Sequence, residues 1–290
     1  MDIQSDVFFK QGSTHDICQD YARAGDAQVA LSDGCSSAPH TDFGSRLLVN
    51  QFFESRTNEI WNDSDFSSQF LASMVLSQVE TLHLPPACLH ATLMTLKFER
   101  GVHGIIGGDG VVAIKYCDGQ IAVLEKIYLT GAPYYPIYDA SPEWKKEYMK
   151  KFRTKEPIYK NYMISPEGEI KEVEERSFPF NFEVAPENGF YINHLNGVEA
   201  VAVFSDGIDS FYSQKNTETS RYGEKIPVSE MIRKFMDFKQ GKGEFVKRRC
   251  KRVLKDDSIY HYDDFSMGAL YFPEVRDENP NTRQKYFTTK

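Results

Sequence analysis

The chain has 290 residues, enough for one large domain or two small ones, and its 41% hydrophobic and 26% charged residues are ordinary for a globular protein. The formal net charge of −8 argues against nucleic acid as an obligatory partner, because the phosphate backbone favours basic surfaces. The five cysteines include no C-x-x-C pair, which argues against a disulfide framework or a structural zinc site. The N-terminal stretch lacks the pattern of a signal peptide, and no apolar run approaches the roughly 20 residues of a membrane helix. We therefore expect a cytoplasmic protein that does not bind membranes.

The first half of the chain predicts strands and two helices. Short apolar segments predict strands at Val7–Lys10, Tyr21–Ala24 and Gln28–Ser32, the last two joined by a hairpin turn at Gly25-Asp26. Apolar residues at helical spacing then predict helices at Asp42–Arg56 and Ser64–Leu82. Closely spaced strands follow at Cys88–Glu99, Gly101–Ile106, Val111–Tyr116 and Ile121–Leu129. The glycine-containing turns between these strands favour antiparallel pairing.

The stretch from Thr130 to Gly197 has a different composition, rich in proline and tyrosine. Within it, Ser141-Pro142 predicts a helix start, because serine is a good cap and proline suits the first helical position. We interpret residues 130–197 as an elaboration of one domain that covers residues 1–290.

The last part of the chain predicts strands at Val198–Phe204 and Phe265–Phe272, with helices at Val228–Phe238 and Gly243–Leu254 between them. Two batches of antiparallel strands with two pairs of helices pack most simply as a β-sandwich covered by helices. The predicted fold class is therefore α+β, a four-layer αββα sandwich whose two mainly antiparallel sheets are covered by helices on both outer faces.

Several aspartates stand where a predicted strand ends and a glycine-containing turn begins: Asp33-Gly34, Gly108-Asp109-Gly110 and Ser205-Asp206-Gly207. Asp263-Asp264 stands at the other end, just before the last predicted strand. Carboxylates brought together in this way repel one another, and divalent cations relieve that repulsion. Oxygen ligands without a cysteine or histidine cluster favour a hard ion, Mg²⁺ or Mn²⁺. Any single Asp-Gly pair is more often an ordinary turn than a metal ligand. The order of the motifs along the chain therefore has to decide between the two interpretations.

Seven short motifs follow one another in chain order: Gly12-Ser13-Thr14-His15, Cys18-Gln19-Asp20, Leu31-Ser32-Asp33-Gly34, Ala91-Thr92, Gly107-Gly108-Asp109-Gly110, Phe204-Ser205-Asp206-Gly207 and Asp263-Asp264-x-Ser266. Their order resembles the PP2C (PPM) phosphatases, and most closely their bacterial-type branch. The resemblance runs from about residue 7 to residue 272.

The resemblance implies a role for each matched residue. Asp33 would bridge two metal ions and the carbonyl of Gly34 would bind one of them. Asp206 and Asp263 would complete the site of the other ion, Asp109 would serve a third ion if one is bound, and Asp20 would orient a metal-bound water.

Two positions depart from the better-known eukaryotic pattern. Gln19 stands where many members have a metal-binding glutamate; its carbonyl can bind a hard cation but adds no charge. His15 stands where many members have an arginine that grips the phosphate, and it offers fewer donors than a guanidinium fork. His15 is then either a general acid for the leaving oxygen or a structural residue.

The predicted function is a Mg²⁺- or Mn²⁺-dependent phosphatase that hydrolyses phosphoserine or phosphothreonine monoesters in proteins through a hydroxide bridging two metals. The predicted partner is a phosphoprotein substrate, and the predicted state is a monomer. Two alternatives stay open: a phosphatase-like binding or regulatory module that is weakly active or inactive, which Gln19 and His15 motivate, and a two-metal phosphodiesterase.

Overall fold

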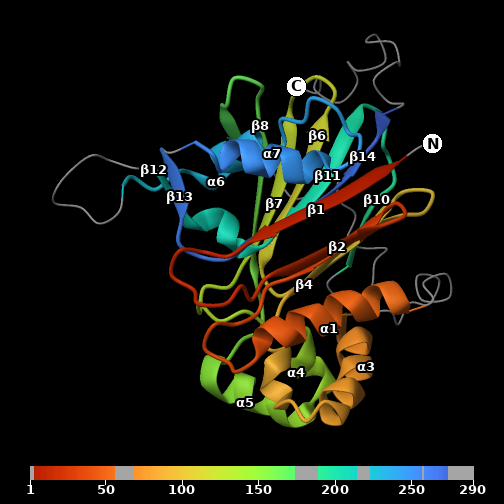
Figure 1. Cartoon of the computed structure of the whole chain (residues 1–290), viewed down its shortest axis with the longest axis vertical. Coiled ribbons are helices and arrows are strands. Elements are labelled where there is room, and N and C mark those ends of the chain that lie inside the picture. Colours follow the sequence, from red (N-terminus) through yellow and green to blue (C-terminus); the bar gives the residue numbers. More distant parts are fainter. Residues whose placement is uncertain (1–2, 56–67, 174–188, 214–222, 257, 274–290) are drawn as a thin grey trace.

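The computed structural model of the chain describes residues 3–55, 68–173, 189–213, 223–256 and 258–273. Two antiparallel sheets stack face to face, and helices cover the outer face of each sheet (Figure 1). The predicted α+β fold with its four layers, helix, sheet, sheet and helix, is confirmed. That residues 1–290 form a single domain stays a prediction, since the residues that the structure describes do not cover the whole chain.

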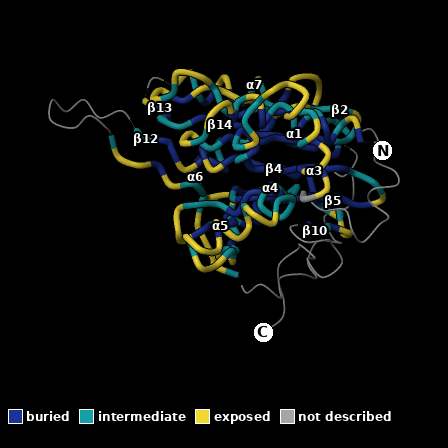
Figure 2. Tube along the Cα trace, turned by 90° about the horizontal axis from the view of Figure 1, so that it is seen from below, coloured by how far each residue is buried: buried dark blue, intermediate teal, exposed yellow. Residues whose placement is uncertain are grey.

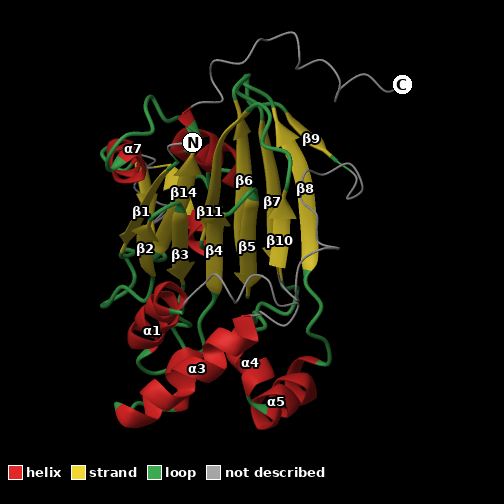
Figure 3. Cartoon of the chain, turned by 90° about the vertical axis from the view of Figure 1, so that its right-hand side faces the viewer, coloured by secondary structure: helices red, strands yellow, loops and turns green. Residues whose placement is uncertain are grey.

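The larger sheet has seven strands in the order β1-β14-β11-β6-β7-β8-β9 (Figure 3). Their bounds are β1 (Gln4–Lys10), β14 (Phe265–Tyr271), β11 (Val198–Phe204), β6 (Gly110–Tyr116), β7 (Ile121–Ile127), β8 (Ile158–Ile164) and β9 (Ile170–Glu172).

The smaller sheet has five strands in the order β10-β5-β4-β3-β2. Their bounds are β10 (Gly189–Ile192), β5 (Val102–Gly107), β4 (Leu93–Phe98), β3 (Gln28–Ser32) and β2 (Tyr21–Gly25), and a separate short pair is formed by β12 (Phe211–Ser213) and β13 (Ile259–His261). The turn between β2 and β3 is the predicted hairpin, with Ala27 at a φ of 51°.

The central strands are apolar on both faces because each face is covered. In β3, Val29 and Leu31 belong to the core between the two sheets, whereas Ala30 packs into the core beneath the helices. In β11, Val203 faces the other sheet and Phe204 faces the helices on the opposite side of the molecule. Successive side chains of a strand point to opposite faces, so two apolar layers require continuous apolar runs.

Six helices make up the outer layers of the described structure. Four lie on the side of the smaller sheet: α1 (Thr41–Glu54), α3 (Ser68–Thr81), α4 (Pro136–Ala140) and α5 (Pro142–Phe152). Two lie on the side of the larger sheet, α6 (Val228–Phe235) and α7 (Phe245–Val253). Figure 2 shows the buried strands between these half-exposed helical layers.

The helix start at Ser141-Pro142 is confirmed, because Ser141 caps α5 and its hydroxyl accepts a hydrogen bond from the amide of Trp144. The prediction of a strand from Cys88 was wrong at its start, since Pro86–Leu89 form a 3₁₀ turn, η1, before β4. Pro86 has no N–H for a sheet and its fixed φ suits the first turn of a helix. The predicted helix start at Ser64 lies outside the described residues.

The elaboration contributes to both sides of the sandwich. Its helix α4 packs against α3, its strands β8 and β9 widen the larger sheet beyond β7, and β10 adds an edge to the smaller sheet. The sequence patterns predict none of these three strands, because β9 and β10 have only three and four residues and the first three side chains of β8 are exposed. Within the described segments, none of the helices is both long and apolar enough to cross a bilayer.

Close packing between α1 and η1 predicts an unusual mutational effect. A Cβ on Gly44 would lie 1.8 Å from the carbonyl oxygen of Cys88. In an open helix Gly→Ala adds about 1 kcal/mol of stability, but overpacking a filled site costs about 1–3 kcal/mol. We expect Gly44→Ala to lower the free energy of unfolding in urea titrations, whereas Glu54→Ala on the exposed side of α1 changes it little. A gain in stability for Gly44→Ala would show that the two elements are not in contact.

Candidate metal centre

The loop between β1 and β2 is tied to the segment before β14 by one buried carboxylate. Asp264 is 2% exposed and accepts hydrogen bonds from the amides of Gly12 (2.7 Å) and Gln19 (2.6 Å). Nδ1 of His15 lies 3.1 Å from the same carboxylate, without the geometry of a regular hydrogen bond. Gly12 is required here, because a Cβ on it would lie 2.3 Å from the backbone of Asp263. Asp264 therefore holds the whole His15–Gln19 loop against the end of the sandwich.

A second buried carboxylate joins the two sheets. Asp20 is completely buried just before β2, and the hydroxyl of Ser205 donates to its Oδ2 at 2.8 Å. The same Ser205 oxygen accepts the amide hydrogen of Ser266 at 2.9 Å. The beginning of β2 in one sheet is thus linked to the end of β11 and the start of β14 in the other.

Asp33 follows β3 and is held by its main chain. Its amide donates to Oγ1 of Thr92 at 2.9 Å, and its carbonyl accepts the amide hydrogen of Thr92 at 2.8 Å. The amide of Gly34 donates to the carbonyl of Gln19 at 3.2 Å, and a Cβ on Gly34 would lie 2.7 Å from Thr41. The side chain of Asp33 therefore leaves a backbone that cannot shift without breaking the pairing with Thr92.

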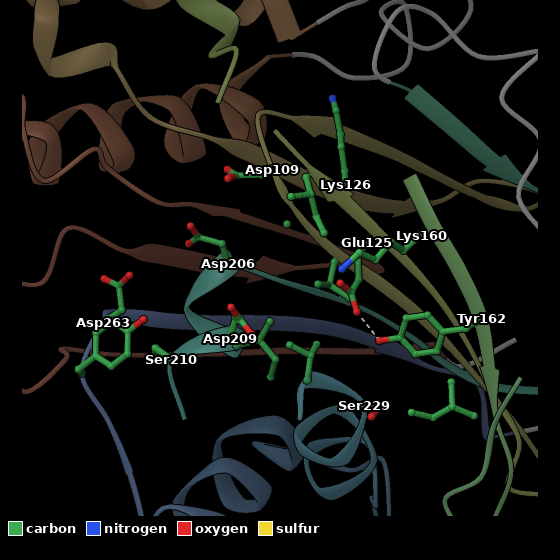
Figure 4. Close-up of a pocket in the computed structure, with 17 residues that line it drawn as sticks. Asp109, Glu125, Lys126, Lys160, Tyr162, Asp206, Asp209, Ser210, Ser229 and Asp263 are labelled. Atoms are coloured by element: carbon green, nitrogen blue, oxygen red, sulfur yellow. Dashed lines mark hydrogen bonds between the residues drawn. The ribbon is translucent and has the colours of Figure 1, made fainter. Parts of the chain in front are cut away.

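Asp206 is the common neighbour of the other carboxylates. It is the first residue of η3 (Asp206–Ser210), directly after β11, and it is exposed. Figure 4 shows it between Asp263 and Asp109. Its charge helps to raise the pKa of Asp20, Asp33, Asp109 and Asp263. Four carboxylates from distant parts of the chain therefore lie close enough to Asp206 for its charge to affect them.

The acidic groups in this cluster hold protons unusually well in the metal-free protein. Burial, assisted by the charges of Asp20 and Asp206, raises the pKa of Asp33 well above its usual value. Burial raises the pKa of Asp20 to about 7, although the neighbouring polar side chains of Asp33, Ser266 and Ser205 oppose the shift. Both shifts arise because carboxylates are withdrawn from water and placed beside one another without enough positive charge.

Asp109 lies in the turn between β5 and β6. Burial and the charge of Asp206 raise the pKa of its carboxyl, and the ammonium of Lys126 opposes this. Lys126 pairs with Gly110 across β6 and β7, is 2% exposed, and donates to the carbonyl of Ile106 at 2.7 Å. Gly110 stands where the family pattern has serine, and its φ of 140° is a conformation that a side chain would strain.

His15 and Gln19 lie at the rim of the cluster. Burial lowers the pKa of His15, but the close carboxylate of Asp264, with the charges of Asp263 and Asp20, raises it above its usual value overall. Nε2 of His15 is 3.4 Å from Oδ1 of Asp263. The side-chain amide of Gln19 donates to Oγ1 of Thr41 at 2.7 Å, which orients its carbonyl oxygen as the free end.

The oxygen atoms of this cluster are the kind of ligand that a hard divalent cation prefers. Oδ1 of Asp20 and Oδ1 of Asp109 are buried atoms with no hydrogen-bond partner, and the surrounding donors are oxygens. In the segments that the structure describes, no three acidic, histidine or cysteine side chains already converge on one point at coordination distance. An ion would therefore have to draw the carboxylates together, and it would remove the repulsion that keeps them apart.

The structure brings all the predicted site residues to one end of the sandwich, from five separate segments. Sequence reasoning missed Asp264, Ser205 and Lys126 as parts of this region. The first two stand inside quoted motifs, Asp263-Asp264-x-Ser266 and Ser205-Asp206-Gly207, and their polar side chains beside buried strands were the available signal. Lys126 gives no sequence signal, because a lysine in a strand is ordinarily exposed.

The raised pKa of Asp33 predicts how its removal acts at different pH values. The pKa of Asp33 is higher in the folded chain than in the unfolded chain, so between these two pKa values the folded chain binds more protons. The free energy of unfolding therefore falls as the pH rises from the unfolded pKa to the folded pKa. We expect Asp33→Asn, without metal, to gain more stability relative to wild type at about pH 8 than at about pH 5.5, and the two gains should differ by about 1 kcal/mol or more. Denaturant titrations at both pH values check this, and an equal gain at both would contradict it.

The amino-acid sequence matches a known protein family. A sequence model of the family Protein phosphatase 2C matches residues 11–254. No curated protein sequence matches the chain.

Solved structures with a similar fold include three bacterial proteins. The Mycobacterium tuberculosis serine/threonine phosphatase PstP/Ppp is 12% identical, with 93% of this chain and 98% of that chain covered and a TM-score of 0.44. PppA, described as a regulatory component of T6SS in Pseudomonas aeruginosa, is 12% identical, with 93% and 98% covered and a TM-score of 0.45. The PPM Ser-Thr phosphatase MsPP from Mycobacterium smegmatis is 14% identical, with 92% and 97% covered and a TM-score of 0.43.

With TM-scores below 0.5, these likenesses add nothing to the assignment, which rests on the sequence match over most of the chain. The chain belongs to the Protein phosphatase 2C family.

Proposed function

We propose that the chain is a Mg²⁺- or Mn²⁺-dependent phosphatase that hydrolyses phosphoserine and phosphothreonine monoesters in proteins. The observation that carries the proposal is the gathering of Asp20, Asp33, Asp109 and Asp263 around Asp206, where burial and mutual repulsion raise the pKa of four of the five carboxyls. A fold keeps such an arrangement at the cost of stability only if something positive is bound there in use.

Two ions are proposed, held by Asp33 with the carbonyl of Gly34 and by Asp206 with Asp263. Asp109 is the candidate for a third ion, although Lys126 already supplies positive charge beside it. Gln19 is proposed as a neutral ligand through its carbonyl oxygen. When bound, the ions supply Lewis acidity toward the phosphoryl group and make the attacking water more acidic.

The other groups of the site hold and move protons. Asp20 has a pKa of about 7 and an unpartnered Oδ1, so it is suited to orient a water and accept its proton near neutral pH. His15 has a raised pKa and lies between Asp263 and Asp264, so we propose that its imidazolium donates to the leaving oxygen. Asp264 is the positioning residue that keeps His15 and Gln19 in place.

A second candidate function is a phosphatase-like regulatory module that binds but does not turn over phosphoproteins. It is favoured by the neutral Gln19 and by the absence, in the described part of the chain, of three side chains already converged on one point. A phosphodiesterase would share the same centre and differ only in substrate. We further propose that the protein is a monomer, acts in the cytoplasm and takes phosphoproteins as substrates.

Matched aspartates in η3 test the enzyme proposal. Asp206→Asn should lower kcat/KM for Mn²⁺-dependent hydrolysis of p-nitrophenyl phosphate and a phosphopeptide by about 10²–10³-fold, because the ion that it would hold supplies stabilisation of transition-state charge, and losing one such stabilising group costs about this much. Asp209→Asn is the control for hydrolysis of p-nitrophenyl phosphate, since Asp209 lies in the same turn and its carboxylate pairs with Lys225 at 2.6 Å.

Three outcomes separate the candidate functions. Equal activity of the two variants contradicts the assignment of Asp206. No hydrolysis by folded wild type at any Mn²⁺ concentration favours the regulatory module. Faster hydrolysis of bis-p-nitrophenyl phosphate than of the monoester favours the phosphodiesterase.

Two substitutions of Gln19 are expected to change the affinity for Mn²⁺ in opposite directions. Gln19→Glu adds a carboxylate to the cluster, so we expect Mn²⁺ to bind more tightly in calorimetry and the metal-free protein to be less stable. The isosteric Gln19→Met removes the amide and should weaken Mn²⁺ binding. Unchanged affinity in both variants would show that Gln19 does not face the ions.

A further inference from the structure

A cleft with a volume of about 530 Å³ opens beside the candidate metal centre (Figure 4). Asp109, Asp206 and Asp263 line one end of it, while Lys160 and Tyr162 line the other. Ligand pockets are commonly about 300–1,000 Å³, so the cleft has room for much more than a phosphoryl group. The part beyond the aspartates has no role in the chemistry proposed above.

The far wall of the cleft comes from the elaboration. In the larger sheet Val111 pairs with Glu125, and Glu125 pairs with Lys160, so these residues form one row across β6, β7 and β8. Asp206 follows β11, which is the neighbour of β6 on the other side. Three strand spacings of about 4.8 Å separate β11 from β8, roughly 14 Å in all.

That span fits a polypeptide rather than a small ester. An extended chain advances about 3.4 Å per residue, so roughly four residues cover 14 Å. A peptide whose phosphorylated residue lies at the aspartates would therefore reach Lys160 with a residue about four positions away.

The ammonium group of Lys160 is available to bind an acidic side chain of such a peptide. It is exposed, and it forms no ion pair within 4.0 Å with any acidic side chain in the described segments. Its register neighbour Glu125 instead accepts a hydrogen bond from the hydroxyl of Tyr162. The ammonium thus keeps its donors for a ligand, while the charge of Glu125 weakens the attraction of an anion.

We propose, on the basis of the phosphatase function above, that this cleft binds the polypeptide that carries the phosphorylated residue, and that Lys160 selects an acidic side chain about four residues from it. The elaboration strand β8 then determines substrate sequence, while the aspartates determine the reaction.

The test compares fluorescent phosphoserine peptides that differ only in having Asp or Ala four residues before or after the phosphoserine. Fluorescence anisotropy with Mg²⁺ gives a dissociation constant for each peptide, and the Ala/Asp ratio of these constants measures the preference. For a partly exposed ion pair we expect wild type to favour Asp about threefold in at least one direction. The preference should shrink at high salt, because salt screens exposed charges.

Three variants assign the preference to the cleft. Lys160→Glu should reverse it, and Glu125→Gln should enlarge it because the opposing charge is gone. Lys171→Glu is the matched control: Lys171 is an exposed lysine of β9 in register with Met163, outside the cleft, and its variant should keep the wild-type preference.

The inference is overturned if wild type binds Asp and Ala peptides equally, if Lys160→Glu keeps the wild-type preference, or if Lys171→Glu changes it as much as Lys160→Glu does. Hydrolysis of p-nitrophenyl phosphate, which is too short to reach β8, is measured separately. Hydrolysis without peptide preference overturns only this inference. A preference that depends on Lys160 in a protein without hydrolysis supports peptide binding and contradicts the phosphatase function.

Discussion

Electrostatic repulsion among carboxylates, imposed by a rigid backbone, is the constraint on which the rest of this structure depends. Asp33 is fixed through its own main chain by Thr92, and Asp20 is fixed by the Ser205 hydroxyl. Asp20 cannot turn into water to relieve the repulsion without breaking this hydrogen bond between the sheets, and the backbone that carries Asp33 cannot shift without breaking its pairing with Thr92. The free energy for keeping the charges together comes from the packed sandwich, and a bound cation recovers it.

The same constraint explains why the fold needs two sheets. One sheet supplies Asp20, just before β2, and Asp33, just after β3, and the other supplies Asp206, just after β11, and Asp263, just before β14. Asp264 and Ser205 join the two sets, because each bonds to groups from both sheets. The packing between the sheets thus becomes part of the candidate metal centre, because a shift of one sheet against the other would separate the proposed ligands.

Sequence patterns were sufficient for the layers and for the place of the aspartates, and insufficient for what surrounds them. Val29 to Leu31 and Val201 to Phe204 are apolar without interruption, which predicts strands covered on both faces. The exposed residues of β8 carry no such signal, since its identity as a strand comes from pairing with β7. Lys126 is buried where its ammonium donates to the carbonyl of Ile106, a contact between residues 20 positions apart that no local pattern predicts.

Binding of hard ions between the two sheets is tested most directly by anomalous diffraction from crystals grown with Mn²⁺. We expect two anomalous peaks at about 2.0–2.4 Å from carboxylate oxygens of Asp33, Asp206 and Asp263, the range of oxygen ligation for hard divalent ions. We also expect the loop held by Asp264 to keep its position. Peaks only at other sites, or none at saturating Mn²⁺, would contradict the account, because the repulsion among these aspartates would then have no counterion.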